Sequence, residues 1–405
     1  MSVKTRFLQG AIVALVFSVS VPALAAQSYT KADTYKNPAI KAGGTVSLLN
    51  LVGHVSVVPA TDGVLAIDSK IVAAADSDAD SQALAGKIKL EIKPEGNDVS
   101  VVAHYPLDDY TNYYYPQENS FVIGWSNTHT TYEGERVEIS NGSFGRGANL
   151  HVDFIVHLPK GVKADVDNKV GMIEANGVNG ALALKSGSGD IKGEDNTGEL
   201  AAHTGSGDIT LSNHDGNLDL ETGSGDVTVD QLKHGDTTAR SGSGDLKLKS
   251  LSGILTAETG SGDVEVSRFT GSGMDIKTGS GGVTISDAQG SLKVRAGSGD
   301  IKAEDYKAGD AVDAHTGSGT IEIDGDLGAV VRLVADSGSG DIVIHTSSLP
   351  SLHINATSDS GDVNVDLPGM QNVSAHSHSV RADVNGAKGS AELEAGSGDV
   401  TFTKH

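Results

Sequence analysis

The chain contains no cysteine in its 405 residues. This absence excludes a disulfide framework, and it also excludes a lipid attached to a cysteine at a processing site. The fold must therefore be stabilised by burial and hydrogen bonding alone. No zinc-ligand spacing or nucleotide-binding loop stands out in the sequence. The recurring Gly-Ser-Gly runs are not phosphate-binding loops, because they precede strands and not helices. We expect no cofactor.

Long apolar runs are scarce as well. The one extended apolar run, residues 11–21, is shorter than the roughly 20 residues that a membrane-spanning helix needs. It follows Lys4 and Arg6 and precedes Ala23-Leu24-Ala25, a pattern typical of a signal peptide. The sequence thus predicts a signal peptide over residues 1–25. It predicts export to the periplasm, the surface or the surroundings of a bacterium, most simply a Gram-negative one.

Basic residues are few relative to acidic ones. The chain holds 30 Lys and Arg against 53 Asp and Glu, a formal net charge of -23. Such a charge argues against nucleic acid and against anionic membrane surfaces as partners. A cell-surface glycan or an envelope protein fits better, with no membrane span and no indication of the oligomeric state.

Three regions follow the signal peptide. Residues 26–42 form a polar lead-in, residues 43–165 form a non-repetitive β-rich region, and residues 166–405 are repetitive. In the second region the alternation and turn residues predict one short helix around residues 80–86. They also predict a turn at residues 94–98 and strands at 44–49, 55–58, 87–92 and 99–102.

The repeat is Gly-Ser-Gly-Asp, followed by alternating apolar residues, a corner and a second alternating stretch. Taking Asp190 as the reference, equivalent positions recur every 18–21 residues as far as Asp399, with a degenerate copy near Val380. Gly282 and Thr320 replace the aspartate in two otherwise intact copies. A fixed period of this kind indicates a stack of similar structural units.

The alternation within each repeat predicts a solenoid. Pairs such as Ile209/Leu211 and Leu218/Leu220 point to one face, and the corner adds a further apolar residue such as Leu232. Stacked coils with three inward points bury a continuous core. We predict an all-β fold: a single-stranded right-handed parallel β-solenoid of 18–21-residue coils, preceded by the non-repetitive β-rich region. A left-handed helix of three hexapeptides per turn is the alternative, but the variable spacing of the repeat disfavours it.

These Gly-Ser-Gly-Asp-[Ile/Val] repeats resemble a bacterial β-strand-repeat family labelled "putative adhesin", a domain of unknown function. The approach to them, residues 152–162, is similar too. The resemblance covers roughly residue 43 to the end and is weakest across residues 105–147. It implies the solenoid fold and, by analogy, attachment at a cell surface, while it implies no catalytic residue.

The Gly-Ser-Gly-Asp corner has two interpretations. In the structural one, glycine supplies a positive φ at a tight turn, while Ser and Asp oxygens accept backbone N–H groups. In the other, stacked aspartates bind calcium weakly, although one carboxylate per coil provides few of the six to eight oxygens that this ion takes. We expect no further metal site; His376 and His378 could pair, but surface histidines explain them more simply. Structural turn roles are assigned to Gly187, Gly189, Asp190, Gly205, Gly207, Asp208, Gly223, Gly225, Asp226, Gly260, Gly262 and Asp263.

Aromatic residues make up only 4% of the chain, and residues 105–147 concentrate them, with six of the nine tyrosines and the single tryptophan. This insertion either contacts a ligand or caps the open end of the solenoid, whose unpaired strand edge would otherwise pair with another chain. The other end, residues 398–405, has no comparable cover. The ligand-binding candidates are Tyr110, Tyr113, Tyr114, Tyr115, Trp125 and Tyr132.

The leading functional prediction is an exported non-enzymatic β-solenoid of the bacterial envelope, acting as an adhesin or as a scaffold that binds glycan or protein. A second candidate is a carbohydrate-active enzyme that cleaves polysaccharide with acids of the 105–147 insertion. A third is a periplasmic structural or stress-associated protein. The short corners favour the first candidate, because they leave no loop-built cleft along the coils.

Overall fold

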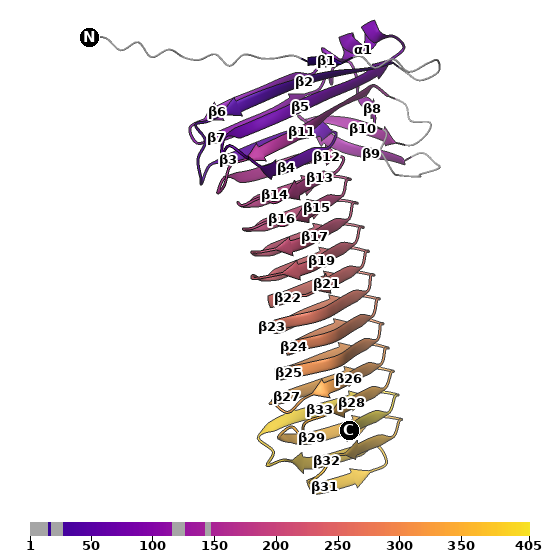
Figure 1. Cartoon of the computed structure of the whole chain (residues 1–405). Coiled ribbons are helices and arrows are strands. Elements are labelled where there is room, and N and C mark those ends of the chain that lie inside the picture. Colours follow the sequence, from indigo (N-terminus) through magenta and orange to yellow (C-terminus); the bar gives the residue numbers. More distant parts are fainter. Residues whose placement is uncertain (1–14, 18–26, 116–125, 142–146) are drawn as a thin grey trace, which may run out of the picture. The chain divides into compact units, whose positions relative to one another are not determined.

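The computed structural model of the chain describes residues 15–17, 27–115, 126–141 and 147–405. Nearly all elements in these residues are strands, and the one helix among them is α1 (Asp78–Ala85). The chain divides into two compact units, residues 1–198 (unit 1) and residues 199–405 (unit 2), each described by itself. Figure 1 shows the strands of each in sequence colours. In the described residues no helix is long and apolar enough to cross a membrane.

In unit 1 most strands form two ladders. The first ladder follows the order β2 (Gln27–Asn37), β5 (Leu65–Ala75), β11 (Asn149–Leu158), β4 (Val55–Pro59), β13 (Ile173–Asn176) and β15 (Ile191–Glu194). The second follows β6 (Lys89–Glu95), β7 (Asp98–His104), β3 (Thr45–Val52), β12 (Lys163–Val170) and β14 (Leu182–Ser186). β1 (Leu15–Phe17) lies antiparallel to β2. The polar lead-in is therefore largely a strand.

The expected strands and the helix of this region are confirmed with small shifts in their bounds. Ser77 begins α1, because its side chain accepts a hydrogen bond from the backbone N–H of Asp80. β3 and β4 already have the geometry of a coil, since they pair in parallel with β12 and β13 on one side. On their other side lie β7 and β11. Coil geometry thus begins upstream of the first sequence repeat.

The aromatic segment contributes a separate small sheet of unit 1. Its strands are β8 (Asn112–Tyr114), β10 (Glu135–Asn141) and β9 (Ser126–Tyr132), in that spatial order.

Unit 2 is a stack of coils with two parallel ladders. The ladder that follows the Gly-Ser-Gly corner contains β17 (Ile209–His214), β19 (Val227–Leu232), β21 (Leu246–Lys249), β26 (Ile321–Asp326) and β28 (Ile342–Thr346). The ladder after the second corner contains β16 (Leu200–Thr204), β18 (Leu218–Thr222), β20 (Thr237–Ser241), β22 (Ser252–Thr259) and β27 (Arg332–Ser337). Three long strands turn through the second corner and belong to both: β23 (Val264–Thr278), β24 (Val283–Ala296) and β25 (Ile301–Thr316). The predicted parallel β-solenoid is confirmed, while its handedness stays a prediction.

The bend at the second corner is made by one residue in the left-handed backbone conformation. A non-glycine residue with φ between 50° and 72° recurs once per coil at Asn213, Gln231, Ser250, Arg268, Asp287 and Asp305. This left-handed conformation interrupts the period-two alternation, so the next side chain points inward. The residues that follow are all buried: His214, Leu232, Leu251, Phe269, Ala288 and Tyr306.

The C-terminal coils are not stacked in chain order. The strands concerned are β29 (Leu352–Ser358), β30 (Val363–Asp366), β31 (Gln371–His376), β32 (Ser379–Val384), β33 (Gly389–Ala395) and β34 (Val400–Lys404). β33 lies between β27 and β29, and β34 lies between β28 and β30. The expectation that residues 398–405 form an uncovered end is therefore wrong. Beyond β29 lie β32 and then β31, both antiparallel, and β32 is the degenerate copy near Val380.

Candidate functional site

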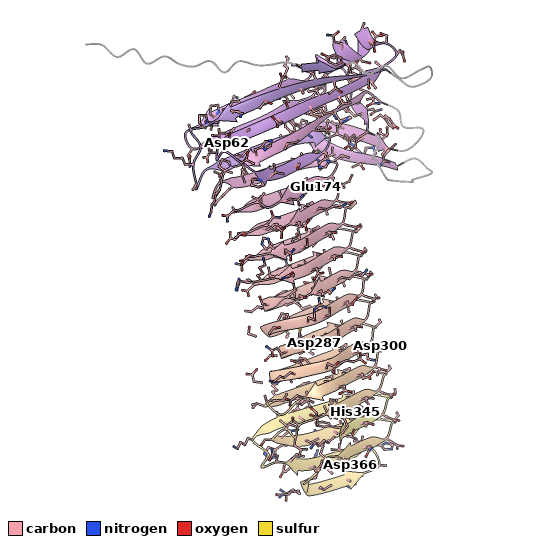
Figure 2. All side chains as sticks on the ribbon, viewed as in Figure 1. Asp62, Glu174, Asp287, Asp300, His345 and Asp366 are labelled. Carbon is pink, nitrogen blue, oxygen red and sulfur yellow. The ribbon has the colours of Figure 1, made fainter. Side chains whose placement is uncertain are left out.

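The aspartates of the Gly-Ser-Gly-Asp corner form a ladder of hydrogen bonds. The backbone N–H of Asp226 donates to Asp208 Oδ1 at 2.9 Å, and that of Asp245 donates to Asp226 Oδ1 at 2.9 Å. The same contact recurs further along unit 2, where Figure 2 labels Asp300. Each carboxylate thus holds the next coil, and a charge-assisted bond of this kind is stronger than a neutral one.

Glycine is needed at this corner for a different reason from the positive φ that the sequence predicted. None of them is among the residues with positive φ. A Cβ atom on Gly225 would instead lie 2.0 Å from the carbonyl oxygen of Gly207 in the preceding coil, and one on Gly244 would lie 2.0 Å from that of Gly225. Glycine is required because the stacked backbones approach too closely for any side chain.

A buried hydroxyl completes the corner, and the predictions missed it. Thr222 Oγ1 donates to the carbonyl oxygen of Gly207 at 2.9 Å and accepts the N–H of Gly225 at 3.0 Å. Ser241 and Thr259 make the same pair of bonds in the next coils. The signal was in the sequence, since Ser or Thr precedes most Gly-Ser-Gly runs. With its polar groups used between coils, the corner works as an internal support.

The metal-binding alternatives that the sequence left open, at the repeat aspartates and at His376 and His378, find little support in the geometry. Among the described residues, no three His, Asp or Glu side chains form a group that could hold a metal ion. His376 is exposed at the end of β31, whereas His378 lies beyond that strand with Nδ1 2.7 Å from the carbonyl oxygen of Gly361. The two imidazoles therefore do not share one strand face.

Three tyrosines of the aromatic segment are core residues of unit 1. The ring centroid of Tyr105 lies 5.5 Å from that of Tyr113 and 5.8 Å from that of Tyr132, each pair edge to face. The Tyr105 hydroxyl donates to the carbonyl oxygen of Val52 at 2.8 Å, and the Tyr132 hydroxyl donates to that of Ala103 at 2.7 Å. Burial raises the pKa of both Tyr113 and Tyr132. The prediction that Tyr113 and Tyr132 contact a ligand is therefore wrong, because their side chains are only 0% and 1% exposed.

The remaining candidates lie nearer the surface. Tyr110, Tyr114 and Tyr115 are half-buried, and Trp125 lies outside the described residues. Lys87 Nζ lies 4.9 Å from the centre of the Tyr110 ring, and the Tyr115 ring meets the His151 ring edge to face at 5.1 Å. These contacts tie the segment to the body of unit 1, which favours the capping interpretation; ligand contact stays a prediction.

We expect His151 to make the stability of unit 1 depend on pH. Burial lowers the pKa of its imidazole, and the nearby Lys70 acts in the same direction, while Asp153 opposes them. A depressed folded pKa means that stability is present above the ordinary value of about 6.5 and is lost as the pH falls below it. We expect His151→Phe to narrow the difference in melting temperature between about pH 7.5 and about pH 5. An equal difference in both proteins, measured by circular dichroism, would contradict this.

A groove lies on unit 2 at the end of the second corner. One hollow of about 310 Å³ is lined by residues of β22–β24, among them the exposed Ile254, with Lys293 and Arg332 beside them. A second hollow of about 350 Å³ shares Ser291 with the first and is lined by Lys307, Asp310 and corner glycines. We name the two hollows together the corner groove. Ile254 is 52% exposed, which is unusual for an isoleucine on this fold.

Extra residues in the chain open this groove. Gly253 pairs with Gly271 but Ile254 pairs with Gly273, so Ser272 is an insertion in its coil. Gly290 pairs with Ala308 and Leu292 pairs with Val312, so β25 has three residues between these two pairs where β24 has one. Bulges of this kind re-aim side chains and often occur beside binding sites. They account for the longer spacing of the repeat in these coils.

Ion pairs alternate along the same surface. Lys293 Nζ lies 2.7 Å from Asp275 Oδ2, and Arg332 Nη1 lies 3.2 Å from Asp313 Oδ2. Burial alone would raise the pKa of Asp313, but the Arg332 guanidinium and His315 outweigh it and hold that pKa below its usual value. The groove therefore presents ammonium, guanidinium, carboxylate and hydroxyl groups on successive coils.

Comparisons with known proteins give one family match and one solved structure. A family model described as Toastrack DUF4097 matches residues 89–273 and residues 215–349. Among solved structures, one described as a "putative cell adhesion protein" from Clostridium sporogenes ATCC 15579 has 10% identity, with 94% of this chain and 100% of that chain covered. Its TM-score is 0.21. A search of curated proteins found no match.

Proposed function

Because the chain belongs to the Toastrack DUF4097 family, we propose that it is an exported, non-enzymatic β-solenoid scaffold of the bacterial envelope. We further propose that it binds an extended, carboxylated glycan along the corner groove. The observation that carries this proposal is the groove itself, two adjoining hollows lined by polar groups beside the bulges of β22–β25.

The spacing of the coils supports an extended ligand. Neighbouring strands lie about 4.8 Å apart, so a polymer that runs along the stack meets a new set of side chains at each step. Ile254 and the corner glycines provide an apolar and flat surface beneath such a polymer, and Ser291 donates a hydrogen bond to Asp310 at 2.5 Å beside it.

The charges of the groove favour an acidic polymer. Lys293, Lys307 and Arg332 gather there in a chain whose net charge is -23. An equal number of aspartates lines the groove (Asp275, Asp310 and Asp313), so it is locally neutral, whereas the protein as a whole repels anions. A carboxylated ligand would bind by replacing these aspartates as the partner of the cations. Carboxylates also suit the planar guanidinium of Arg332, which can form paired hydrogen bonds with them.

The binding test compares matched substitutions. Titration calorimetry with a hexamer of galacturonic acid should show binding, and a hexamer of glucose should bind more weakly. Lys293→Gln and Arg332→Gln should each weaken the Kd about 10- to 100-fold, as expected for loss of a charged hydrogen bond worth about 1.5–3 kcal/mol. Lys247→Gln, on the strand β21 outside the groove, serves as the control.

Two outcomes would contradict this proposal, one for the carboxylated glycan as the ligand and one for the groove as the site. If neither hexamer binds, the chemistry of the ligand is different. If the charged hexamer binds with equal affinity to all three variants but not to a chain with Tyr114→Ser and Tyr115→Ser, the aromatic segment is the site.

Export can be tested on intact cells. We expect mass spectrometry of the mature protein to place its first residue at Ala26, directly after the small-residue sequence. Brief protease treatment of intact cells should degrade a surface scaffold. Complete protection in intact cells, with digestion after the outer membrane is opened, would place the protein in the periplasm and remove the adhesin interpretation.

A further inference from the structure

The C-terminal segment, residues 389–405, occupies a slot between two coils that precede it in the chain. β33 pairs in parallel with β27 through Leu333↔Ala391 and with β29 through Ile354↔Ala391. β34 pairs in the same way with β28 and β30. The coils of β27–β28 and β29–β30 therefore both precede, in the chain, the strands that lie between them.

The slot is shaped closely for this segment. Leu393, Val400 and Phe402 are at most 1% exposed. The aspartate ladder also passes through the slot, because the N–H of Asp399 donates to Asp341 Oδ1 and the N–H of Asp362 donates to Asp399 Oδ1, both at 2.8 Å. All of these partners come from the stretch 332–366, and none comes from the short linker that leads into the segment.

That linker, residues 385–388, has a constrained backbone. Asn385, Gly386 and Ala387 have φ values of 51°, 80° and 42° in succession. Glycine and asparagine adopt this left-handed conformation readily, but alanine rarely does, because its Cβ approaches the following carbonyl group. The N–H of Lys388 then donates to the carbonyl oxygen of Ser351 at 3.2 Å. The linker is therefore a tight connection that would gain freedom by extending.

We infer that two copies of this chain can exchange residues 389–405, each copy filling the slot of the other. The exchanged segment would find the same strands, the same buried positions and the same aspartate contacts as in its own chain. The two arrangements differ only in the linker and in the cost of association, so protein concentration decides between them. A short strained hinge favours the exchanged form. This proposal concerns self-association and is independent of the glycan proposal.

The absence of native cysteine allows a direct test by disulfide formation. Val343 and Thr401 are paired neighbours on β28 and β34. Their Cα atoms are about 4.8 Å apart, within the range of about 4.4–6.8 Å that a disulfide allows. Chains with Val343→Cys are mixed with chains with Thr401→Cys, unfolded together, refolded at high concentration and oxidised. Exchange predicts a covalent dimer that contains one chain of each kind.

Two controls make the result decisive. The double variant Val343→Cys with Thr401→Cys, refolded at low concentration, should close a disulfide within one chain and so confirm the register. A mixture of Thr284→Cys and Thr401→Cys chains reports random collisions, because Thr284 pairs with residues of β23 and β25 instead. A dimer yield equal to that of the random mixture would overturn the proposal.

The linker provides an independent variant. Inserting Gly-Ser-Gly between Ala387 and Lys388 relaxes the connection and should reduce the dimer yield of the Val343→Cys and Thr401→Cys mixture. An unchanged yield would show that linker strain does not drive the exchange.

Discussion

Gly281→Ala should strongly destabilise unit 2, whereas Gly282→Ala should leave it as stable as the parent or slightly more so. A Cβ atom on Gly281 would lie 2.0 Å from the carbonyl oxygen of Gly262, a backbone atom fixed by the coil beneath. A Cβ atom on Gly282 would meet nothing closer than 3.5 Å, an ordinary contact. These two adjacent glycines of one corner therefore distinguish a position where a side chain would clash from one where glycine only adds freedom to the unfolded chain.

The expected sizes follow from the two mechanisms. Overpacking a rigid interior typically costs about 1–3 kcal/mol, and a clash with a fixed backbone atom lies at the upper end of this range, which corresponds to a drop in Tm of roughly 6–12 °C for a unit of this size. Replacing a glycine at an unstrained position gains about 0.4–1 kcal/mol, because the unfolded chain loses freedom. Thermal unfolding followed by circular dichroism measures both. Equal melting temperatures for the two variants would mean that neighbouring coils separate without cost.

Removing residues 389–405 should open the end of unit 2. The truncation removes the buried side chains of Leu393, Val400 and Phe402, each worth about 1.5–3 kcal/mol of burial. It also leaves the edges of β27 and β28 unpaired on one side and those of β29 and β30 on the other. We expect a loss of roughly 5 kcal/mol or more, with fast amide exchange across these four strands.

A shorter truncation is the matched control for this prediction. Deleting only Lys404 and His405 removes exposed side chains and keeps both ladders of the segment, so it should leave amide exchange in β29 and β30 nearly unchanged. If the long truncation also left those strands protected, β29 and β30 would have to close directly onto β27 and β28.

The period of the sequence was enough to predict most of the fold. Equal spacing and period-two alternation define which residues point inward, and they define which coil neighbours which wherever the copies follow one another regularly. They fail at the C-terminal end because all coils present similar edges. β29 could pair with β27 as well as with β33, and the alternating pattern contains no information that distinguishes them.

The candidate site was harder to predict than the fold. Tyr105, Tyr113 and Tyr132 stand in one aromatic segment with Tyr114 and Tyr115, and a tyrosine ring suits a core and a binding surface equally well. The burial of Tyr113 and Tyr132 and the partial exposure of Tyr114 are decided by how β8 and β9 pair with β10, which the sequence does not show. The corner groove had a visible trace in the longer spacing of its coils, but a change in repeat length does not reveal at which corner the extra residue lies.

The left-handed residue at each second corner has a consequence for how such proteins can diverge. Asparagine, glutamine, serine, arginine and aspartate all serve there, so the bend depends on a dihedral angle and not on a side-chain type. One of the two corners of each coil therefore has no characteristic residue type in the amino-acid sequence. A related chain that has lost most of its recognisable Gly-Ser-Gly-Asp repeats, but keeps these bends and its inward-facing apolar residues, would still form the same solenoid.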